Sequence, residues 1–302
     1  MILKSPAKLN LYLKVLAKRK DNYHNLRTIF ERISLCDTIV LRLRRDGKII
    51  IRCNNPRVPG GEKNIAFAAA RLLQKSLKVN YGAEIKISKR IPVGSGLGGG
   101  SSNAASVLLG LNKLWKLSLT KQRLAGLAKK LGSDVPFFIY EKPFAEGTGR
   151  GQRIKLLPAL NRVRLWHVLA VPKVQVLTPE IYKKWDSNRR TPPLPNIKKI
   201  ERAGLTMPEY DVKIWTSVLK ARALILLSQL LFNDLEKITL KAYPGAKKIK
   251  ERLEDLGPKA ILMSGSGPAV FAVVSSRKEA LSLSRKLKAA DSSCLVSAVR
   301  TF

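Results

Sequence analysis

Cysteine and histidine are scarce in this chain of 302 residues, which contains three and two of them. The cysteines, Cys36, Cys53 and Cys294, are far apart and odd in number, so a disulfide framework is not expected. The two histidines, His24 and His167, are too few to complete a structural zinc site with these cysteines. We therefore expect a cytoplasmic protein, in a reducing compartment, with no metal centre of its own.

Long hydrophobic runs are also missing, and this limits the class of protein. The longest run, residues 223–227, ends at Ser228. It is far shorter than the roughly 20 apolar residues that span a membrane, so we interpret it as part of a buried helix and expect no membrane partner. Lys4, Lys8 and Lys14 interrupt the first apolar stretch, so no signal peptide is expected. With 45% hydrophobic residues, the chain is still long enough to bury one large core or two modest ones.

Acidic residues are few, since 21 Asp and Glu stand against 57 Lys and Arg, for a formal net charge of +36. Such a charge is typical of proteins that bind nucleic acid. The basic residues are spread along the chain without a long basic tail, however, and the aromatic residues, at 6%, form no strip suited to stacking bases. We interpret the charge as a general basic bias that also attracts small anionic substrates, and we expect no dedicated nucleic-acid partner.

The chain does have a glycine-rich segment between a predicted strand and a predicted helix. Five glycines within eleven residues carry a large cost in chain entropy, which indicates a specific role. Without Cβ atoms the backbone approaches a ligand closely and directs N–H groups at it, and the N-terminus of the following helix adds partial positive charge. This combination predicts a phosphate-binding loop. Its residues are Pro92, Val93, Gly94, Ser95, Gly96, Leu97, Gly98, Gly99, Gly100, Ser101 and Ser102.

Two common phosphate-binding loops do not fit this segment. Gly94, Gly96 and Gly99 have the spacing of the dinucleotide-binding fingerprint, but residues 114–120 carry no acid where that fold needs one. A Walker A loop needs a lysine that is missing here, and the Asp-Phe-Gly and His-Arg-Asp motifs of protein kinases are missing too. A flexible linker does not explain the strand and the helix on either side.

Other segments place polar residues where chemistry is possible. In residues 6–15, apolar and polar residues alternate as in a half-buried strand, which puts Lys8 and Asn10 on a polar face that, by itself, indicates only solvation. Asp134 precedes Pro136 at a predicted helix start, where a helix N-cap is the simplest interpretation. Residues 263–268, by themselves, predict a tight turn between two strands.

Together these segments resemble the GHMP kinase superfamily, whose members phosphorylate small metabolites with ATP. The glycine-rich loop is similar to the second motif of that superfamily. Residues 6–11, Pro-Ala-Lys-Leu-Asn-Leu, match its first motif at every position, and residues 132–136, Gly-Ser-Asp-Val-Pro, match the segment that carries its catalytic aspartate. The turn at 263–268 is similar to a second glycine-rich loop, so the resemblance extends from one end of the chain to the other.

The resemblance implies a role for each motif. Lys8 would lie beside the hydroxyl that is phosphorylated, Asn10 would help to place the substrate, and Asp134 would accept the proton of the attacking hydroxyl. ATP would be the phosphoryl donor, with its triphosphate held by residues 92–102, and Mg²⁺ would arrive with ATP rather than in a dedicated protein cage. The second loop would lie beside the phosphates and the small-molecule substrate through Gly265, Ser266 and Gly267.

One pair of residues narrows the substrate within the superfamily. Tyr23 and His24 resemble the pair with which one branch contacts a cytosine base: the tyrosine stacks and the histidine makes polar contacts. Tyr182 stands where that branch often has an aromatic on the other face of the base. We therefore expect an acceptor that carries a cytidine diphosphate group, with a mevalonate- or homoserine-type kinase as the alternative. The chain departs from the branch at Asn22, Arg150 and Arg190.

The mixed order of predicted strands and helices favours an α+β fold. Strands are expected up to about residue 53 and at 83–91, helices at 64–79, 101–115, 120–131, 211–232 and 246–256, and a strand, a helix and a strand over 259–302. The resemblance implies a two-domain GHMP kinase fold with the active site between the domains. The N-terminal domain, residues 1–195, would be ribosomal protein S5 domain 2-like, and the C-terminal domain, residues 196–302, a ferredoxin-like α/β sandwich. We expect a monomer or a weak homodimer.

Overall fold

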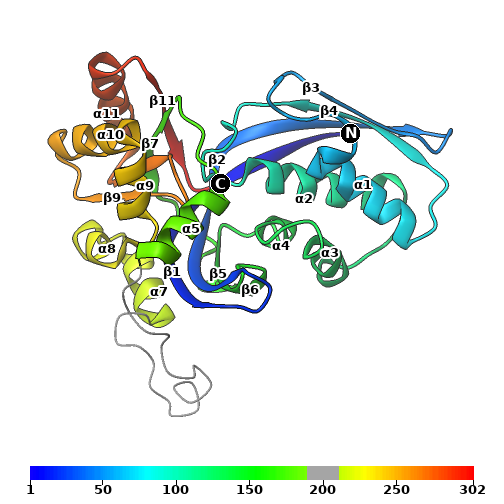
Figure 1. Cartoon of the computed structure of the whole chain (residues 1–302), viewed down its shortest axis with the longest axis horizontal. Helices are drawn as coiled ribbons and strands as arrows, with labels where there is room; N and C mark the ends of the chain where they lie inside the picture. Colours follow the sequence, from blue (N-terminus) through cyan, green and yellow to red (C-terminus); the bar gives the residue numbers. More distant parts are fainter. Residues whose placement is uncertain (189–210) are drawn as a thin grey trace, which may run out of the picture.

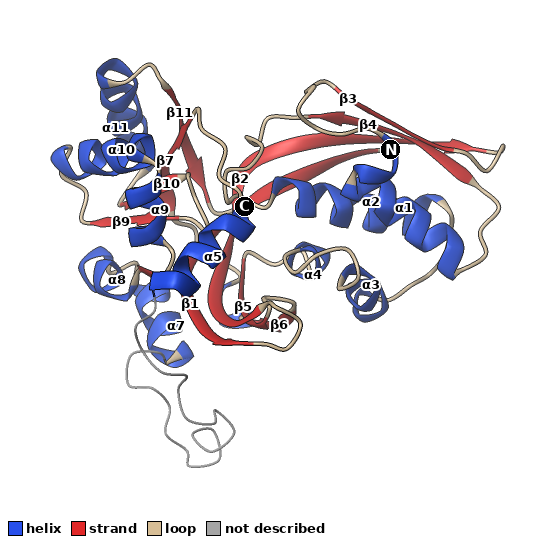
Figure 2. Cartoon of the chain, in the orientation of Figure 1, coloured by secondary structure: helices blue, strands red, loops and turns tan. Residues whose placement is uncertain are grey.

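A computed structural model of the chain describes residues 1–188 and 211–302, and it contains two β-sheets covered by helices (Figure 1, Figure 2). The first sheet contains β1 (Ile2–Lys18), β2 (His24–Arg44), β3 (Ile49–Cys53), β4 (Gly82–Ser88), β5 (Phe144–Gly149), β6 (Arg153–Leu156) and β8 (Phe232–Asn233). Its order is β3-β4-β2-β1-β8, and β5 pairs with both β2 and β6. The pairs are antiparallel except β3 with β4 and β1 with β8.

Strand β1 carries the first motif and is buried on both faces. Leu9 and Leu11 pack in the core, as the alternation predicts. The opposite face is covered by the glycine-rich loop, because Cγ of Lys8 lies 3.1 Å from the position that a Cβ on Gly98 would take. Lys8 is 4% exposed and Asn10 is 3% exposed, so the polar face of the strand is enclosed rather than solvated at these two residues, as the resemblance implies. Both polar groups must therefore find their partners inside the protein.

Four helices lie against one face of the first sheet (Figure 1): α1 (Ile65–Ser76), α2 (Gly99–Leu114), α3 (Lys121–Ala128) and α4 (Val135–Ile139). The helices expected from residues 64 and 120 each begin at a side-chain N-cap. Oδ1 of Asn64 accepts the N–H of Ala66 at 2.9 Å, and Oγ1 of Thr120 accepts the N–H of Arg123 at 3.3 Å. The sheet and the helices share one core, which includes Phe30, Ile39, Leu41, Leu73, Leu108 and Phe137.

The second sheet contains β7 (Trp166–Pro172), β9 (Ala260–Met263), β10 (Val270–Val274) and β11 (Cys294–Arg300), in the antiparallel order β11-β7-β10-β9. Helices α9 (Glu236–Ala242), α10 (Pro244–Asp255) and α11 (Arg277–Ala290) lie beside it (Figure 1). The succession β7, α10, β9, β10, α11, β11 is the β-α-β-β-α-β pattern of a ferredoxin-like fold. The predicted architecture of the C-terminal part is therefore confirmed. Its core includes Val168, Ala170, Ile249, Leu253, Val270 and Leu283.

The helical region expected at 211–232 consists of two short helices. The first, α7 (Val212–Ala221), ends at Arg222, whose φ of 51° is left-handed, and α8 (Leu224–Leu230) follows. The apolar run at 223–227 is not buried as expected, because Ile225 is 74% exposed and Leu227 is the buried residue of α8. Composition alone suggested burial, but a short helix turns only one side toward a core.

The predicted domain boundary at 195/196 lies outside the described residues. Strand β7 and helix α5 (Thr178–Asn188) both precede it, and β7 belongs to the second sheet. Farther along the chain, β8 returns to the first sheet beside β1. The two parts therefore interlock, with α5 at their junction (Figure 1). Within the part of the chain that is described, no helix combines the length and the hydrophobicity that crossing a membrane requires.

Candidate active site

One cleft collects nearly all the residues that the sequence predicts for a site. It has a volume of about 890 Å³ and is lined from both parts of the fold. Its lining includes Lys8, Asn10 and Asp134, the glycine-rich loop and the aromatic residues expected at a base. Two predicted site residues do not line it. They are Ser102, whose buried hydroxyl accepts a hydrogen bond from Ser5, and Gly267.

The glycine-rich loop has a backbone that only glycine adopts easily. Gly94, Gly96 and Gly98 have φ values of +67°, +77° and +67°. A Cβ on Gly96 would lie 2.3 Å from the carbonyl oxygen of Ser264, so the loop packs directly on the second glycine-rich turn. Helix α2 begins at Gly99, immediately after the loop. The free N–H groups of its first turn therefore lie at the cleft, where they stabilise an anion.

Asp37, on β2, fixes the entrance to this loop. Its buried carboxylate accepts the N–H groups of Arg90 and Ile91 through Oδ1, at 2.7 and 2.8 Å. Through Oδ2 it accepts Nζ of Lys89 at 2.5 Å and Nδ2 of Asn103 at 2.9 Å. Because these contacts replace sheet pairing, β4 ends three residues before the predicted end at 91. One carboxylate thus joins the segment before the loop to the helix after it.

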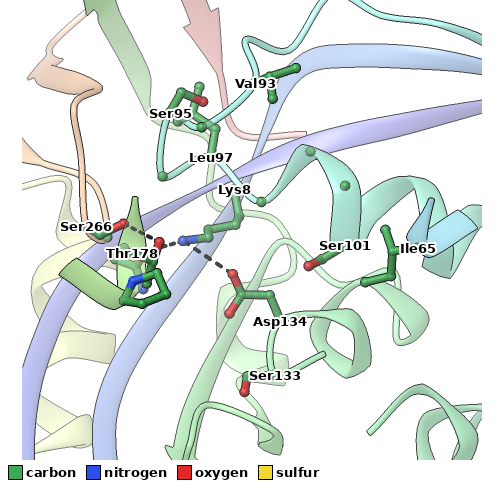
Figure 3. A pocket seen from close by; sticks show the side chains of 18 of the residues that line it. Lys8, Ile65, Val93, Ser95, Leu97, Ser101, Ser133, Asp134, Thr178 and Ser266 are labelled. Carbon is green, nitrogen blue, oxygen red and sulfur yellow. Dashed lines mark hydrogen bonds and ion pairs between the residues drawn. The ribbon is translucent and has the colours of Figure 1, made fainter. Parts of the chain in front are cut away.

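Lys8 and Asp134 meet inside the cleft (Figure 3). Nζ of Lys8 lies 3.6 Å from Oδ2 of Asp134. Burial lowers the pKa of Lys8, and the carboxylate of Asp134 acts in the opposite direction, in favour of the charged ammonium. Asp134 stands at the N-cap position of α4, but its side chain makes no capping hydrogen bond. The capping interpretation is therefore wrong, and the carboxylate faces Lys8 instead.

Asn10 connects Lys8 to the rest of the site. Nζ of Lys8 donates to Oδ1 of Asn10 at 2.5 Å, and Nδ2 of Asn10 donates to Oγ1 of Thr28 at 2.8 Å. Oγ1 of Thr28 donates in turn to the carbonyl oxygen of Tyr12 at 2.6 Å. The backbone N–H of Asn10 donates to Oγ of Ser264 at 3.2 Å. These bonds fix the ammonium relative to the second glycine-rich turn, to which Ser264 belongs.

The second glycine-rich turn, between β9 and β10, approaches the same pair from the other sheet. A Cβ on Gly265 would lie 3.3 Å from Nζ of Lys8 and 3.2 Å from Oδ1 of Asn10. The hydroxyl groups of Ser266 and Thr178 are 2.8 Å apart (Figure 3). The turn therefore brings backbone of the second part next to the ammonium and connects it to the start of α5.

The residues expected at a base lie toward α5. Tyr23 is 55% exposed, and the guanidinium carbon of Arg150 lies 4.6 Å from its ring centroid. His24 is buried, and the ring of Tyr182 stacks on it with centroids 5.3 Å apart and 18° between the planes. One face of Tyr182 is thus occupied by His24, and Tyr182 also lines the cleft. Asn22 has a φ of 62°, a left-handed turn conformation that asparagine adopts more readily than other residues with a side chain.

Sequence analysis missed several residues that hold the site. Asp37 and Asp186 belong to no recognised motif, and each binds a residue far away in the chain: Asp37 is 66 positions from Asn103, and Asp186 is 162 positions from His24. The scarcity of acidic residues was the one signal in the sequence that pointed to them, since the chain has only 21 Asp and Glu. The missed residues are Thr28, Asp37, Lys89, Asn103 and Asp186.

Positive charge dominates the cleft. A cleft lined by one sign of charge concentrates ligands of the opposite sign, and phosphate groups are the natural ligands here. The acids in the lining are Asp134 and Asp186. The basic residues in the lining are Lys8, Lys18, Arg57, Lys63, Lys89, Arg150 and Lys183.

Comparison with known proteins places the chain in a class. The family model of the GHMP kinases N terminal domain matches residues 64–142, and that of the GHMP kinases C terminal domain matches residues 217–292. A crystal structure of a homoserine kinase from Cytophaga hutchinsonii has a TM-score of 0.71 at 18% identity and covers 100% of this chain and 94% of its own, which shows a shared fold. The fold and the two glycine-rich segments are those of a GHMP kinase, and the chain is a kinase of this class.

More similar proteins narrow the class. A 4-diphosphocytidyl-2-C-methyl-D-erythritol kinase from Geobacillus sp. is 41% identical over 274 residues, which are 91% of this chain and 88% of the relative. The protein of the same name from Citrifermentans bemidjiense is 42% identical over 278 residues, which are 91% and 90%. A crystal structure of 4-(cytidine 5′-diphospho)-2C-methyl-D-erythritol kinase has a TM-score of 0.76 at 32% identity and covers 99% of both chains. The chain belongs to the 4-diphosphocytidyl-2-C-methyl-D-erythritol kinase family.

Proposed function

We propose that this chain transfers the γ-phosphoryl group of ATP to the 2-hydroxyl of 4-diphosphocytidyl-2-C-methyl-D-erythritol, in the non-mevalonate route to isoprenoid precursors. One observation carries the proposal: Lys8 and Asp134 lie 3.6 Å apart in a cleft that Tyr23 and His24 also line. The pair supplies the chemistry of a kinase, and the aromatic residues supply a site for the base.

We assign ATP, the phosphoryl donor, to the side of the cleft at which α2 begins. The backbone of residues 92–102 approaches phosphate oxygens closely, and Arg57, Lys63 and Lys89 line the same cleft. Nζ of Lys89 lies 2.8 Å from the position that a Cβ on Gly99 would take, so this ammonium stands beside the N-terminus of α2. Ser102 does not line the cleft and supports the loop from within, through its hydrogen bond with Ser5.

In the transfer, the 2-hydroxyl oxygen bonds to the γ-phosphorus while the bond from that phosphorus to the bridging oxygen of ADP breaks. Asp134 accepts the hydroxyl proton, and the ammonium of Lys8 stabilises negative charge on the group in transfer. Phosphoryl transfer has a loose transition state in most analyses, so positioning and electrostatics contribute more than proton removal. The hydrogen bond from Lys8 to Asn10 supplies that positioning.

Mg²⁺ would enter with ATP and would neutralise negative charge that develops on the phosphates. Asp134 and the hydroxyl of Ser101 offer the oxygen ligands that Mg²⁺ prefers. Oγ of Ser101 lies 4.0 Å from the position that a Cβ on Gly132 would take, two residues before Asp134. Across residues 1–188 and 211–302, no group of three or more His, Cys, Asp and Glu could hold a metal. These donors fit a cation delivered by the nucleotide.

The acceptor is assigned to the α5 side of the cleft. The exposed ring of Tyr23 offers a stacking surface for cytosine, and His24 and Tyr182 line the same cleft, where His24 offers a polar contact. Asn10, Gly265 and Ser266 lie between that region and the Lys8–Asp134 pair, in the place for the sugar alcohol. Gly267 supports the turn, since a Cβ there would lie 2.5 Å from the sulfur of Met263.

ADP release from ATP tests the assignment with three acceptors: 4-diphosphocytidyl-2-C-methyl-D-erythritol, mevalonate and homoserine. We expect turnover with the first alone. Turnover with mevalonate or homoserine, without turnover of the cytidylyl compound, would favour a different GHMP kinase. Location in the cytoplasm and a monomeric or weakly dimeric state stay predictions, the second of which light scattering on the purified chain tests.

A further inference from the structure

His24 is enclosed by residues of one helix. Tyr182 and Asp186 are four positions apart on α5 and therefore lie on the same face. Tyr182 stacks on the imidazole, Trp185 meets it edge-on at 5.3 Å and 80°, and Oδ1 of Asp186 lies 2.8 Å from Nε2. The side chain of His24 is only 3% exposed. Helix α5 therefore fixes both the position and the orientation of the ring.

The state of Asp186 determines which nitrogen of His24 carries a proton. Oδ2 of Asp186 accepts a hydrogen bond from Nζ of Lys18 at 2.7 Å. Partial burial acts to raise the pKa of Asp186, but the hydrogen bonds from Lys18 and His24 outweigh it and hold the pKa below its usual value. An ionised carboxylate has no proton to donate, so the proton in the bond to His24 belongs to Nε2.

The other ring nitrogen is then an acceptor. A neutral imidazole with its proton on Nε2 has a lone pair on Nδ1. Because Nε2 is engaged with Asp186, Nδ1 is the ring nitrogen that is left for a polar contact with a ligand in the cleft that His24 lines. Cytosine carries an amino donor where uracil carries a carbonyl acceptor. An acceptor at Nδ1 pairs with the first and leaves two acceptors facing each other with the second.

We propose that Asp186, through its hydrogen bond to Nε2 of His24, fixes the imidazole tautomer and thereby sets a preference for cytidine over uridine in the acceptor. This inference rests on the proposed function, since it assumes a cytidylyl acceptor. Asp186 is a positioning residue that acts through His24, and Lys18 keeps it ionised. A site that pairs with a polar group of one substrate rejects the analogue that lacks it.

Nitrogen-15 NMR of histidine tests the tautomer directly. The chain has two histidines, so His24 is resolved against His167, which pairs with Glu31 and serves as an internal reference. We expect His24 to be protonated on Nε2 and unprotonated on Nδ1. In Asp186→Asn, the amide both donates and accepts, so the single tautomer should be lost. A proton on Nδ1 in the wild type would overturn the inference without the need for any variant.

The matched control is Glu180→Gln, which removes an exposed carboxylate from the same helix, outside the cleft lining. We expect this variant to keep the wild-type spectrum of His24. An Asp186→Asn spectrum that matches the wild type also contradicts the inference. Thermal unfolding of both variants checks that α5 remains docked.

Binding tests the preference itself. Calorimetry with cytidine 5′-diphosphate and uridine 5′-diphosphate gives a ratio of affinities for each variant. Loss of one matched hydrogen bond corresponds to a factor of about ten, so we expect Asp186→Asn to reduce the cytidine preference about tenfold while Glu180→Gln retains it. The KM for ATP should be the same in both variants. A nucleotide ratio in Asp186→Asn equal to that of the wild type would overturn the proposal.

The two proposals fail in different ways. A wild-type enzyme that binds neither nucleotide and phosphorylates another acceptor contradicts the proposed function and, with it, the preference. A wild-type enzyme that uses the cytidylyl acceptor but shows no change of tautomer or preference in Asp186→Asn contradicts the role of Asp186 alone.

Discussion

Replacement of Asp134 by asparagine keeps the shape of the side chain and removes a charge 3.6 Å from Nζ of Lys8. Two unit charges about 4 Å apart attract each other by about 1 kcal/mol in water and about 4 kcal/mol at an effective dielectric constant of about 20. The side chain of Asp134 is 30% exposed and that of Lys8 is 5% exposed, so the pair lies between these limits. The same substitution removes a proton acceptor, which contributes about 10²- to 10⁴-fold to a rate. We expect kcat to fall by about two to four orders of magnitude.

Rates of ADP release with both substrates saturating give kcat, and variation of each substrate gives the two KM values. The KM for ATP should change less than kcat, because residues 92–102 are untouched. The fold should persist, since Asp134 makes no capping hydrogen bond that the substitution could break. Glu141→Gln is the control, because Glu141 is an exposed acid paired with Lys121 shortly after α4. Wild-type turnover in Asp134→Asn would remove this residue from the mechanism. Lys8→Ala should also lower kcat by about two to four orders of magnitude, because it removes an electrostatic group of the catalytic site.

The pH dependence of the Asp134→Asn variant gives an independent check. Burial lowers the pKa of Lys8 and Asp134 opposes it, so the pKa of Lys8 should fall further without that carboxylate. Residual activity that needs the ammonium should then be lost at a lower pH than in the wild type. Because its pKa is lowered on folding, Lys8 binds protons less readily in the folded state than in the unfolded state. Its buried charge therefore destabilises the fold fully at any pH below the folded-state pKa, and this cost disappears above the unfolded value of 10.5. An alkaline limb of activity identical to that of the wild type would contradict the pairing.

Three other substitutions test the donor loop, its anchor and the base site. Gly98→Val should raise the KM for ATP or abolish turnover, because the φ of Gly98 is +67° and a Cβ there would lie 3.1 Å from Cγ of Lys8. Gly126→Val is the control: a Cβ at Gly126 meets open space, so ATP kinetics should stay unchanged. Asp37→Asn should lower the melting temperature and raise the KM for ATP, because removing one partner of a buried ion pair costs about 3–5 kcal/mol. Asp46→Asn, in an exposed turn, should change neither quantity. An unaltered KM for ATP in Asp37→Asn would refute the role of Asp37 as the anchor of the loop. Tyr23→Ala should raise the KM for the cytidylyl acceptor about tenfold to a hundredfold, since a base stacked on an aromatic loses about 1–3 kcal/mol on truncation, while a wild-type value would take Tyr23 out of the base site.

Residue patterns predicted the parts of the site that depend on local sequence. The glycine-rich loop between a strand and a helix, and the helices expected to begin near Asn64 and Thr120, follow from short-range chemistry, and the structure has them. The partners of Asn10 do not follow from it. Register shifts in β1 between Asn10 and Tyr12 decide which β2 residue lies opposite, and they bring Thr28 within reach of Asn10. Such irregularities depend on packing around the whole sheet, and no period in the sequence reports them.

The surroundings of His24 show a second reason why sequence falls short. Helical spacing places Tyr182 and Asp186 on one face of α5, yet it does not say what that face meets. The answer depends on how α5 docks at the junction of the two parts, where Tyr182 stacks on His24 and Asp186 binds it. The resemblance assigned Tyr182 to the far side of a bound base, and that role stays a prediction.

The glycines of the two loops also allow two distant segments to touch. Oγ of Ser264 accepts the N–H of Asn10 at 3.2 Å and donates to the carbonyl oxygen of Gly96 at 3.4 Å. Its own carbonyl oxygen would lie 2.3 Å from a Cβ on Gly96, a distance that no side chain tolerates. Ser264 thus joins the donor loop to the strand that holds Lys8, and any side chain at Gly96 must separate them. The entropy cost of glycine in this loop is therefore matched by a contact between the two parts of the fold, which keeps the phosphate site and the ammonium in one fixed geometry.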